Sequence, residues 1–238
     1  MLKGKICVIT GAAQGIGFEI AQLFLKNGAT VIGLDCCHEN GFDHGIEFIN
    51  LDVSNTQECE IVCKNIIDNK GCVDVLVNCA GITSDALTKK MDENQFDSVI
   101  SVNLKGVWNI TRIIGPHMQT VKSGSIINIS SVVGIYGNIG QANYAATKAG
   151  VIGMTKTWAK EFAYKGGNVR VNAIAPGYTL TNMLKTVPQE LLDRFASQTM
   201  LGRLAEPIEI ANVALFLASD MSSYITGSII QADGGMRL

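Results

Sequence analysis

Short β-branched runs alternate with longer amphipathic segments from one end of the chain to the other, and this alternation constrains the fold most strongly. The β-branched runs are almost entirely apolar, as expected for strands buried on both faces of a parallel sheet. The seven runs expected to form strands are Lys5–Thr10, Thr30–Leu34, Glu47–Leu51, Val73–Asn78, Gly124–Ser130, Arg170–Ala175 and Ser228–Ala232. The six segments with a helical period are Ile16–Asn27, Asn55–Asp68, Asn94–Gln119, Ala142–Lys165, Gln189–Gln198 and Ile208–Ala218.

Strand–helix alternation of this kind predicts right-handed crossovers and a doubly wound α/β sheet. The 238 residues contain no repeat, low-complexity tract or linker, so residues 1–238 are expected to form a single domain. One crossover is irregular, because the twelve residues DCCHENGFDHGI between Leu34 and Glu47 hold two glycines and no apolar period of a helix. The second crossover helix is therefore expected to be short or missing.

Composition excludes several classes of function. With 19 basic and 21 acidic side chains and a formal net charge of −2, the chain lacks the basic excess typical of proteins that bind nucleic acid or anionic membranes. The N-terminal apolar run of four residues is too short for a signal peptide or a membrane span, which favours a cytoplasmic protein.

The seven cysteines form an odd set crowded into the first third of the chain, which is a poor disulfide framework. They are expected to be small apolar packing residues in a reducing compartment. Cys59 and Cys63 could share a helix face as metal ligands, but the three histidines offer no paired spacing nearby. No metal site is therefore expected, because structural zinc usually takes four ligands in recognisable pairs.

A glycine-rich turn lies between the first expected strand and the first expected helix. Gly11, Gly15 and Gly17 follow the pattern G-x-x-x-G-x-G, unlike the common G-x-G-x-x-G fingerprint. Glycines here allow a tight turn and close backbone approach to a pyrophosphate, which the free N–H groups of the helix N-terminus would bind. A purely structural turn is the alternative, and the position between strand and helix favours a dinucleotide site.

Asp35 ends the second expected strand, 18 residues after Gly17. A carboxylate at this place can accept hydrogen bonds from both adenosine ribose hydroxyls and would repel a 2′-phosphate. Gln14 and Cys36 stand, uncharged, where a basic side chain would bind that phosphate. These residues favour NAD(H) without excluding NADP(H), and the alternative for Asp35 is a solvated turn residue.

Further polar and small residues follow the third and fourth expected strands, where the ligand crevice of an open α/β sheet lies. Asp52 could accept a hydrogen bond from an adenine amino group, or it could cap the helix that begins near Ser54. Asn78, with Ala80 and Gly81, could bound the cofactor cleft.

Three side chains suggest the reacting groups. Among the five tyrosines only Tyr144 has a lysine four residues later, so Tyr144 and Lys148 would share one helix face. A phenol with a pKa near 10 needs a neighbouring cation to lose its proton easily, and Lys148 is placed to supply one. Ser131 lies 13 residues before Tyr144 and could bind the substrate oxygen. Ser130 is its rival, although strand alternation would send the two side chains to opposite faces.

Taken together, these residues resemble the short-chain dehydrogenase/reductase family over essentially the whole chain. The matching motifs are Thr10–Gly17, Asn78–Gly81, Asn103, Ser131, Tyr144, Lys148 and Pro176-Gly177. The resemblance implies a seven-stranded Rossmann fold with Tyr144 as general acid/base, Lys148 holding the nicotinamide ribose, and Ser131 orienting the carbonyl. It also implies that Asn103 holds a water in a proton relay, whereas the alternative for Asn103 is a helix residue that bonds backbone.

The residues and the resemblance together predict one set of cofactor contacts: Gly11, Gln14, Gly15, Ile16, Gly17, Asp35, Asp52, Val53, Asn78, Ala80, Gly81, Tyr144, Lys148, Pro176, Gly177, Thr179 and Thr181. The segment Tyr178–Met200 is expected to form a mobile lid over an apolar substrate pocket that includes Thr179, Leu180, Met183 and Leu184.

Within that family, four stretches look most like bacterial 3-oxoacyl-[acyl-carrier-protein] reductases: Gly137–Ala146, Leu201–Arg203, Ser223–Gly227 and Asp233–Met236. That likeness implies reduction of the keto group of a 3-oxoacyl thioester by hydride. It also implies docking of an acidic carrier protein on two basic positions near the site mouth, held here by Lys122 and Lys165. Their alternative reading is a pair of solvated lysines.

Two other functions stay open at this point. The first is an NAD-dependent dehydrogenase of the same family that oxidises a steroid, a polyol or a 3-hydroxyacyl thioester, which Asp35 favours. The second is a regulatory protein that binds the cofactor without chemistry. The segments that include Val151, Trp158 and Ile208–Leu217 are richer in apolar residues than one sheet face needs, which favours an oligomer. The resemblance implies that it is a homotetramer, because such helices in this family pair across two-fold axes.

Overall fold

The computed structural model describes residues 1–37, 45–181 and 188–236. Its strands are β1 Ile6–Thr10, β2 Thr30–Asp35, β3 Ile46–Asn50, β4 Val75–Asn78, β5 Gly124–Ile129, β6 Val169–Pro176 and β7 Ile229–Ala232. They form one seven-stranded sheet in the order β3-β2-β1-β4-β5-β6-β7. Every neighbouring pair is parallel, which confirms the expected sheet.

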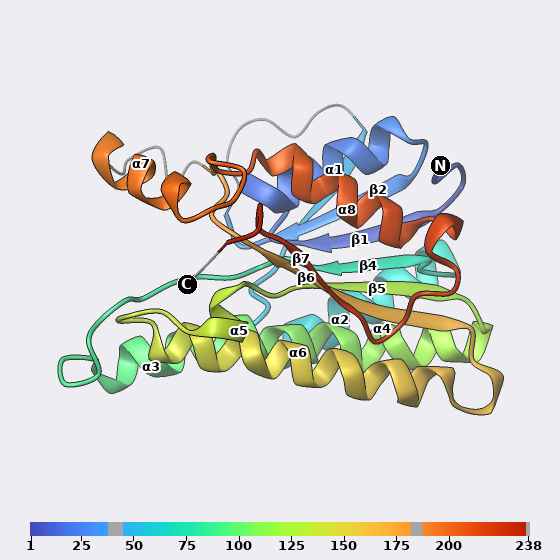
Figure 1. Ribbon diagram of the computed structural model, residues 1–238. Helices are drawn as coiled ribbons and strands as arrows, with labels where there is room; N and C mark the ends of the chain where they lie inside the picture. The colour runs from blue at the N-terminus through green and yellow to red at the C-terminus, as the bar shows by residue number, and fades with distance from the viewer. Residues whose placement is uncertain (38–44, 182–187, 237–238) are drawn as a thin grey trace.

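Helices cover both faces of this sheet (Figure 1). They are α1 Gly15–Lys26, α2 Thr56–Lys70, α3 Glu93–Ile100, α4 Val107–Val121, α5 Val133–Tyr136, α6 Ala142–Ala163, α7 Gln189–Ser197 and α8 Pro207–Ala218. Apolar side chains of α1 and α8 pack on one face of the sheet, and those of α2, α4 and α6 pack on the other. Two separate cores result, which explains why the strands are apolar on both faces.

The strand order reverses direction at β1, which lies between β2 and β4. The crossovers leave β1 and β4 toward opposite edges of the sheet, so the loops at the carboxyl ends of these two strands separate. In a doubly wound sheet this is the place where a ligand crevice forms.

One expected helix is not regular. The segment predicted as a single helix over Asn94–Gln119 consists of α3, a π-helical stretch Ser101–Gly106, and α4. Asn103 lies in that stretch, and its amide group both accepts from the Ile82 N–H and donates to the Ile82 carbonyl, at 2.8 Å each. The wider π-helical turn thus coincides with a contact between Asn103 and the loop that contains Ile82. Such turns often occur at functional sites.

Several expectations concern residues that the structure does not describe. The second crossover contains residues 38–44, which lie outside the described residues, so the short or missing helix stays a prediction. Within the lid segment, residues 182–187, including Met183 and Leu184, are likewise outside. Among the described residues, no helix has the length and apolar character needed to cross a membrane.

Candidate active site

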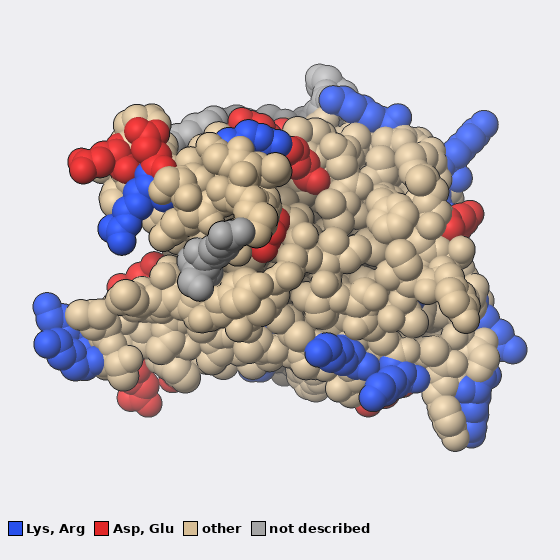
Figure 2. Space-filling view, in the orientation of Figure 1, with Lys and Arg blue, Asp and Glu red and all other residues tan. Residues whose placement is uncertain are grey.

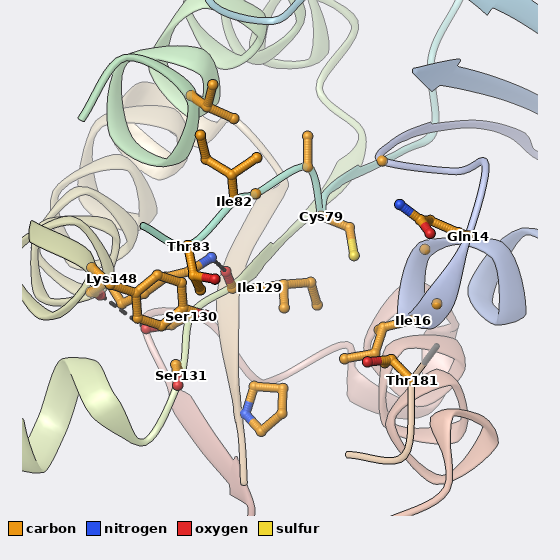
Figure 3. A pocket seen from close by; sticks show the side chains of 18 of the residues that line it. Gln14, Ile16, Cys79, Ile82, Thr83, Ile129, Ser130, Ser131, Lys148 and Thr181 are labelled. Carbon is orange, nitrogen blue, oxygen red and sulfur yellow. Dashed lines mark hydrogen bonds between the residues drawn. The ribbon is translucent and has the colours of Figure 1, made fainter. Parts of the chain in front are cut away.

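A cavity of about 440 Å³ opens at the carboxyl ends of β1, β2, β4, β5 and β6, and Figure 3 shows its lining from close by. Figure 2 shows a hollow on the same side of the molecule, below α7, with basic and acidic side chains in separate small groups around it. The predicted site residues that line the cavity are Gly11, Gln14, Gly15, Ile16, Gly17, Asp35, Asp52, Val53, Ala80, Gly81, Ser131, Tyr144, Lys148, Pro176, Gly177, Thr179 and Thr181. Two predicted residues, Asn78 and Asn103, are not part of that lining.

In the glycine-rich turn at the start of α1, a side chain has no room at Gly11 or at Gly17. Gly11 has a φ of +69°, and a Cβ there would lie 2.8 Å from the Ala80 backbone, while a Cβ on Gly17 would clash with the Gly11 carbonyl. No side chain caps α1, and its first turn holds no acidic residue. The Asp35 carboxylate accepts from the Ala13 N–H, before the helix begins, and no side chain caps the N–H groups of the first helical turn, an arrangement that fits a pyrophosphate.

Asp35 and Asp52 lie at the same end of the cavity. The Asp35 carboxylate accepts 3.0 Å hydrogen bonds from the N–H groups of Ala13 and Cys37, which hold it between the glycine-rich turn and the loop after β2. Asp52 accepts from the Ser54 N–H at 2.9 Å, and Asn55 caps α2 instead. Asp52 is thus a turn residue with its side chain at the cavity wall, and the alternative interpretation of Asp52 as a helix cap is wrong.

Asn78 does not bound the cleft, contrary to the prediction. Its amide is buried and donates to Thr111 Oγ1 at 3.0 Å and to Asn128 Oδ1 at 2.8 Å. Asn128 in turn donates to Thr155 at 2.9 Å, so this buried polar chain ties the sheet to α4 and α6. The side chain points into the helical layer because of its place in the strand alternation, and its contribution to the site is structural.

Thr10 joins the first and fourth strands at the cavity. Its hydroxyl accepts hydrogen bonds from the N–H groups of Cys79 and Ala80, at 3.0 and 3.1 Å. This pair of bonds fixes the loop after β4 against the glycine-rich turn.

Ser131 and Ser130 both line the cavity but have different partners. The Ser130 hydroxyl donates to the Lys148 carbonyl at 2.9 Å, which anchors the end of β5 to α6. The Ser131 hydroxyl accepts from the Val133 N–H at 3.1 Å and interacts with the Tyr144 phenol. Ser131 is therefore the serine with its hydroxyl beside the phenol, as the spacing predicts.

Tyr144 and Lys148 lie one turn apart on α6, with the Lys148 ammonium 5.5 Å from the centroid of the Tyr144 ring. Burial raises the pKa of Tyr144 to about 12, and the Ser131 hydroxyl opposes that shift. Burial also lowers the pKa of Lys148 to about 8. Both shifts disfavour the charged form, so the phenol of the ligand-free site is protonated and holds its proton more tightly than an exposed phenol does.

The buried lysine has one hydrogen-bond acceptor. Its Nζ donates to the Ile129 carbonyl at 2.8 Å, as the dashed line in Figure 3 shows. No salt bridge of the described residues includes Lys148, which is only 4% exposed. The Lys148 ammonium is therefore held by this hydrogen bond and by burial, and its other N–H donors remain available for further hydrogen bonds.

Asn103 lies beside this group without lining the cavity. A Cβ on Gly81 would lie 3.4 Å from Asn103 Oδ1 and 3.6 Å from Lys148 Nζ, so both polar groups face the same glycine. The two hydrogen bonds to Ile82 match the alternative interpretation, in which Asn103 is a helix residue that bonds backbone.

Lys122 and Lys165 do not lie near the mouth of their own site, contrary to the prediction. Lys122 ends α4 just before β5, and Lys165 follows α6 just before β6. Both therefore lie at the amino ends of strands whose carboxyl ends form the cavity. Since a strand rises about 3.3 Å per residue, β5 alone separates them from the cavity by about 20 Å.

The structure adds lining residues that sequence reasoning did not propose for the cavity wall. They include Cys37, Ile82, Thr83, Val102, Val133, Gln141 and Tyr178. Ile82 and Thr83 directly follow the Asn78–Gly81 motif, so extending that motif would have found them. Val102 and Val133 carry no local signal, because apolar residues in helices are most often core.

Comparisons with known proteins agree with this geometry. The family model described as enoyl-(acyl carrier protein) reductase matches residues 11–237. The 3-oxoacyl-[acyl-carrier-protein] reductase of Thermotoga maritima is 50% identical, over 99% of this chain and 98% of its own length. The chain belongs to the short-chain dehydrogenase/reductase family.

Other relatives extend the match. The 3-oxoacyl-[acyl-carrier-protein] reductase of Vibrio cholerae is 42% identical, over 99% of this chain and 98% of its own length. The crystal structure of gox2181 superposes with a TM-score of 0.91 at 32% identity, covering 98% of this chain and 96% of that one. As a member of this family, the protein is an oxidoreductase that acts on a CH–OH or C=O group with a nicotinamide cofactor. A purely regulatory role is therefore not supported.

Proposed function

We propose that this enzyme reduces the keto group of a 3-oxoacyl thioester, with NADH as the favoured cofactor. The observation that carries the proposal is the juxtaposition of Ser131, a protonated Tyr144 and the buried Lys148 beside an apolar cavity. The relatives of Thermotoga maritima and Vibrio cholerae, named for reduction of 3-oxoacyl-[acyl-carrier-protein], support the choice of substrate.

The nicotinamide cofactor supplies the hydride in this reaction. Ser131 orients the substrate by donating its hydroxyl hydrogen to the keto oxygen, where negative charge develops. Tyr144 donates its phenolic proton to the same oxygen, acting as general acid. The Lys148 ammonium lowers the free energy of the phenolate that remains, and its unused hydrogen-bond donors are available to the cofactor ribose.

The remaining predicted residues would hold the cofactor. The first turn of α1 would bind the pyrophosphate with backbone N–H groups. The Asp35 carboxylate would accept hydrogen bonds from the hydroxyls of the adenosine ribose. Among the described residues, Gln14, Cys36 and Cys37 line the cavity near Asp35, and none of them is basic. An added 2′-phosphate would face a carboxylate without a compensating cation, which supports NADH over NADPH.

We expect acetoacetyl-CoA to be reduced, with a kcat/KM at least about tenfold higher for NADH than for NADPH, equivalent to about 1.4 kcal/mol. Asp35→Ser should narrow that ratio by raising the KM for NADH and lowering the KM for NADPH. Steady-state kinetics with both cofactors measures each value. Glu47→Ser, on the neighbouring strand β3 and outside the cavity lining, serves as the control. A wild-type preference for NADPH would contradict the assignment.

Oxidation of a secondary alcohol is the second candidate, favoured by Asp35 because NAD(H) use often accompanies oxidation. Assaying steroid, polyol and 3-hydroxyacyl-CoA alcohols with NAD, in parallel with acetoacetyl-CoA and NADH, separates the two. The higher kcat/KM identifies the reaction.

A carrier-linked substrate remains part of the proposal, although docking of the carrier beside a subunit's own cavity through Lys122 and Lys165 is not supported by their position. Comparing acetoacetyl-CoA with the carrier-linked acetoacetyl group tests whether the carrier contributes to kcat/KM.

We also propose a homotetramer. Some of the apolar residues expected to form its contacts pack inside the chain instead, because Val151 and Trp158 are buried. Other apolar side chains remain exposed, notably Trp108 on α4 and Met221 and Tyr224 after α8. Light scattering at micromolar concentration is expected to give about four times the chain mass of 25.4 kDa. A monomer would contradict this prediction.

A further inference from the structure

Two neighbouring thiols and a carboxylate form a compact group at the adenosine end of the cavity. The ligand atoms of Asp35, Cys36 and Cys37 all lie within 4.8 Å of one another. All three residues line the cavity, and both cysteines are exposed. The mechanism described above uses only Asp35, so the two thiols have no role in it.

The chain geometry explains why adjacent side chains converge here. Along a strand, successive side chains point to opposite faces, but β2 ends at Asp35 and the chain bends at Cys36. The Cys37 N–H then donates to Asp35 Oδ1 at 3.0 Å, which closes the turn. As a result the two sulfur atoms are 3.8 Å apart and point to the same side as the carboxylate.

The sulfur–sulfur distance matches a metal site better than a disulfide. Two thiolates bound to one tetrahedral Zn²⁺, with Zn–S bonds of about 2.3 Å, are separated by about 3.8 Å. A disulfide prefers Cα atoms at least about 4.4 Å apart, whereas neighbouring residues hold them at about 3.8 Å across a trans peptide. The pair can therefore chelate a soft cation without rearrangement, while a disulfide between them would be strained.

The electrostatic surroundings also favour a cation. Among the described residues, Asp35 takes part in no salt bridge, and its carboxylate accepts hydrogen bonds from backbone N–H groups alone. Within the described part of the chain, Lys148 is the lone basic side chain of the cavity lining, and it donates to the Ile129 carbonyl at the nicotinamide end. Two potential thiolates and one carboxylate thus gather with no counter-charge among the described lining residues.

We propose that Asp35, Cys36 and Cys37 bind a thiophilic divalent cation of the Zn²⁺ class, and that this cation and the nicotinamide cofactor exclude one another. Three protein ligands leave one tetrahedral position for solvent. The exclusion rests on the proposed role of Asp35 as acceptor for the ribose hydroxyls, since a cation bound to this carboxylate would occupy oxygen lone pairs, and the space beside them, that those hydroxyls would use. The cation would act as an inhibitor at the adenosine end of the site.

The test uses the reduced full-length protein, with Zn²⁺ as ligand and Co²⁺ as its spectroscopic substitute. We expect one Co²⁺ per chain, with an intense thiolate-to-metal charge-transfer absorption that Zn²⁺ abolishes. Cys36→Ser and Cys37→Ser each leave one thiolate, so each should lower the absorption per bound Co²⁺ by about half and weaken binding by more than about tenfold. Cys72→Ser is the matched control, because Cys72 is a partly exposed thiol 3.8 Å from the carboxylate of Asp74 but has no second thiol beside it.

Linkage provides the second measurement. NADH should raise the apparent dissociation constant of Co²⁺, and Co²⁺ should raise that of NADH by the same factor. A lack of charge-transfer absorption in the wild type, or absorption of full wild-type intensity in both Cys36→Ser and Cys37→Ser, would overturn the site. Co²⁺ binding that NADH leaves unchanged would overturn the exclusion. Because the absorption needs no turnover, a protein that binds Co²⁺ but reduces no 3-oxoacyl thioester would refute the proposed function alone.

Discussion

Tyr144→Phe is expected to lower kcat for keto reduction by about 10²- to 10⁴-fold, the range typical of a lost general acid. The phenol is the protonated group beside Ser131, because burial raises the pKa of Tyr144 to about 12. Phenylalanine keeps the ring and its packing on α6 but removes the proton. The dissociation constant of NADH, measured by fluorescence titration, should change by less than about threefold, since only the hydroxyl is deleted.

Tyr136→Phe is the matched control for that substitution. Tyr136 lies on the short helix α5 close to the site, is 51% exposed, and accepts a 2.8 Å hydrogen bond from Gln231 instead of lining the cavity. Loss of the Tyr136 hydroxyl should leave kcat within about twofold of the wild-type value, because substitutions at exposed positions usually have small effects. Equal kcat values for wild type and Tyr144→Phe would refute the assignment of the general acid.

Lys148→Met is expected to abolish most turnover and at the same time to stabilise the cofactor-free protein. The pKa of Lys148 falls from 10.5 to about 8 because of burial, so the folded state disfavours the ammonium. At pH 7 that shift lowers the free energy of unfolding of the wild type by about 3 kcal/mol. Removing Lys148 relieves this penalty, and the loss of its hydrogen bond to Ile129 offsets about 1 kcal/mol of the gain. The free energy of unfolding at pH 7 should therefore rise by about 2 kcal/mol in the variant.

The pH dependence gives this prediction a distinct signature. A lysine with a depressed folded pKa destabilises the protein fully below about pH 8, and the penalty disappears as the pH rises toward the unfolded value of 10.5. The stability gap between Lys148→Met and wild type should therefore close over that range in urea titrations. Lys156→Met, an exposed position on the same helix, should show no such gap. A variant less stable than wild type at pH 7 would refute the prediction.

For Tyr144 and Lys148, the sequence predicts where the two groups lie, whereas the structure decides their charge state. The four-residue spacing of Tyr144 and Lys148 places them on one helix face in any α-helix, so their proximity is predictable from the chain alone. The charge state of each group depends on burial by residues distant in sequence, such as the end of β5 that supplies the Ile129 carbonyl. Spacing predicts a phenol near a cation, but it does not predict that both groups resist ionisation.

The errors in the sequence analysis have the same origin. Asn78 follows the motif at the carboxyl end of a strand, but its amide faces Thr111 and Asn128, which come from elements 33 and 50 residues away. The helix expected over Asn94–Gln119 changes to a π-helical stretch around Asn103, where a loop 21 residues earlier bonds its side chain. Lys122 and Lys165 look like site-mouth residues by motif position, yet the strand direction puts them at the other end of the sheet.

The amino-acid sequence by itself determined the strand–helix alternation, the glycine-rich turn and the Tyr144–Lys148 pair, because periodicity, turn geometry and helical spacing act over a few residues. Only the tertiary structure decided which polar groups reach the cavity, how strongly burial suppresses the charge of Lys148, and that the thiols of Cys36 and Cys37 converge beside Asp35. Side-chain direction and desolvation depend on all the surrounding elements, and these come together only when the chain is folded.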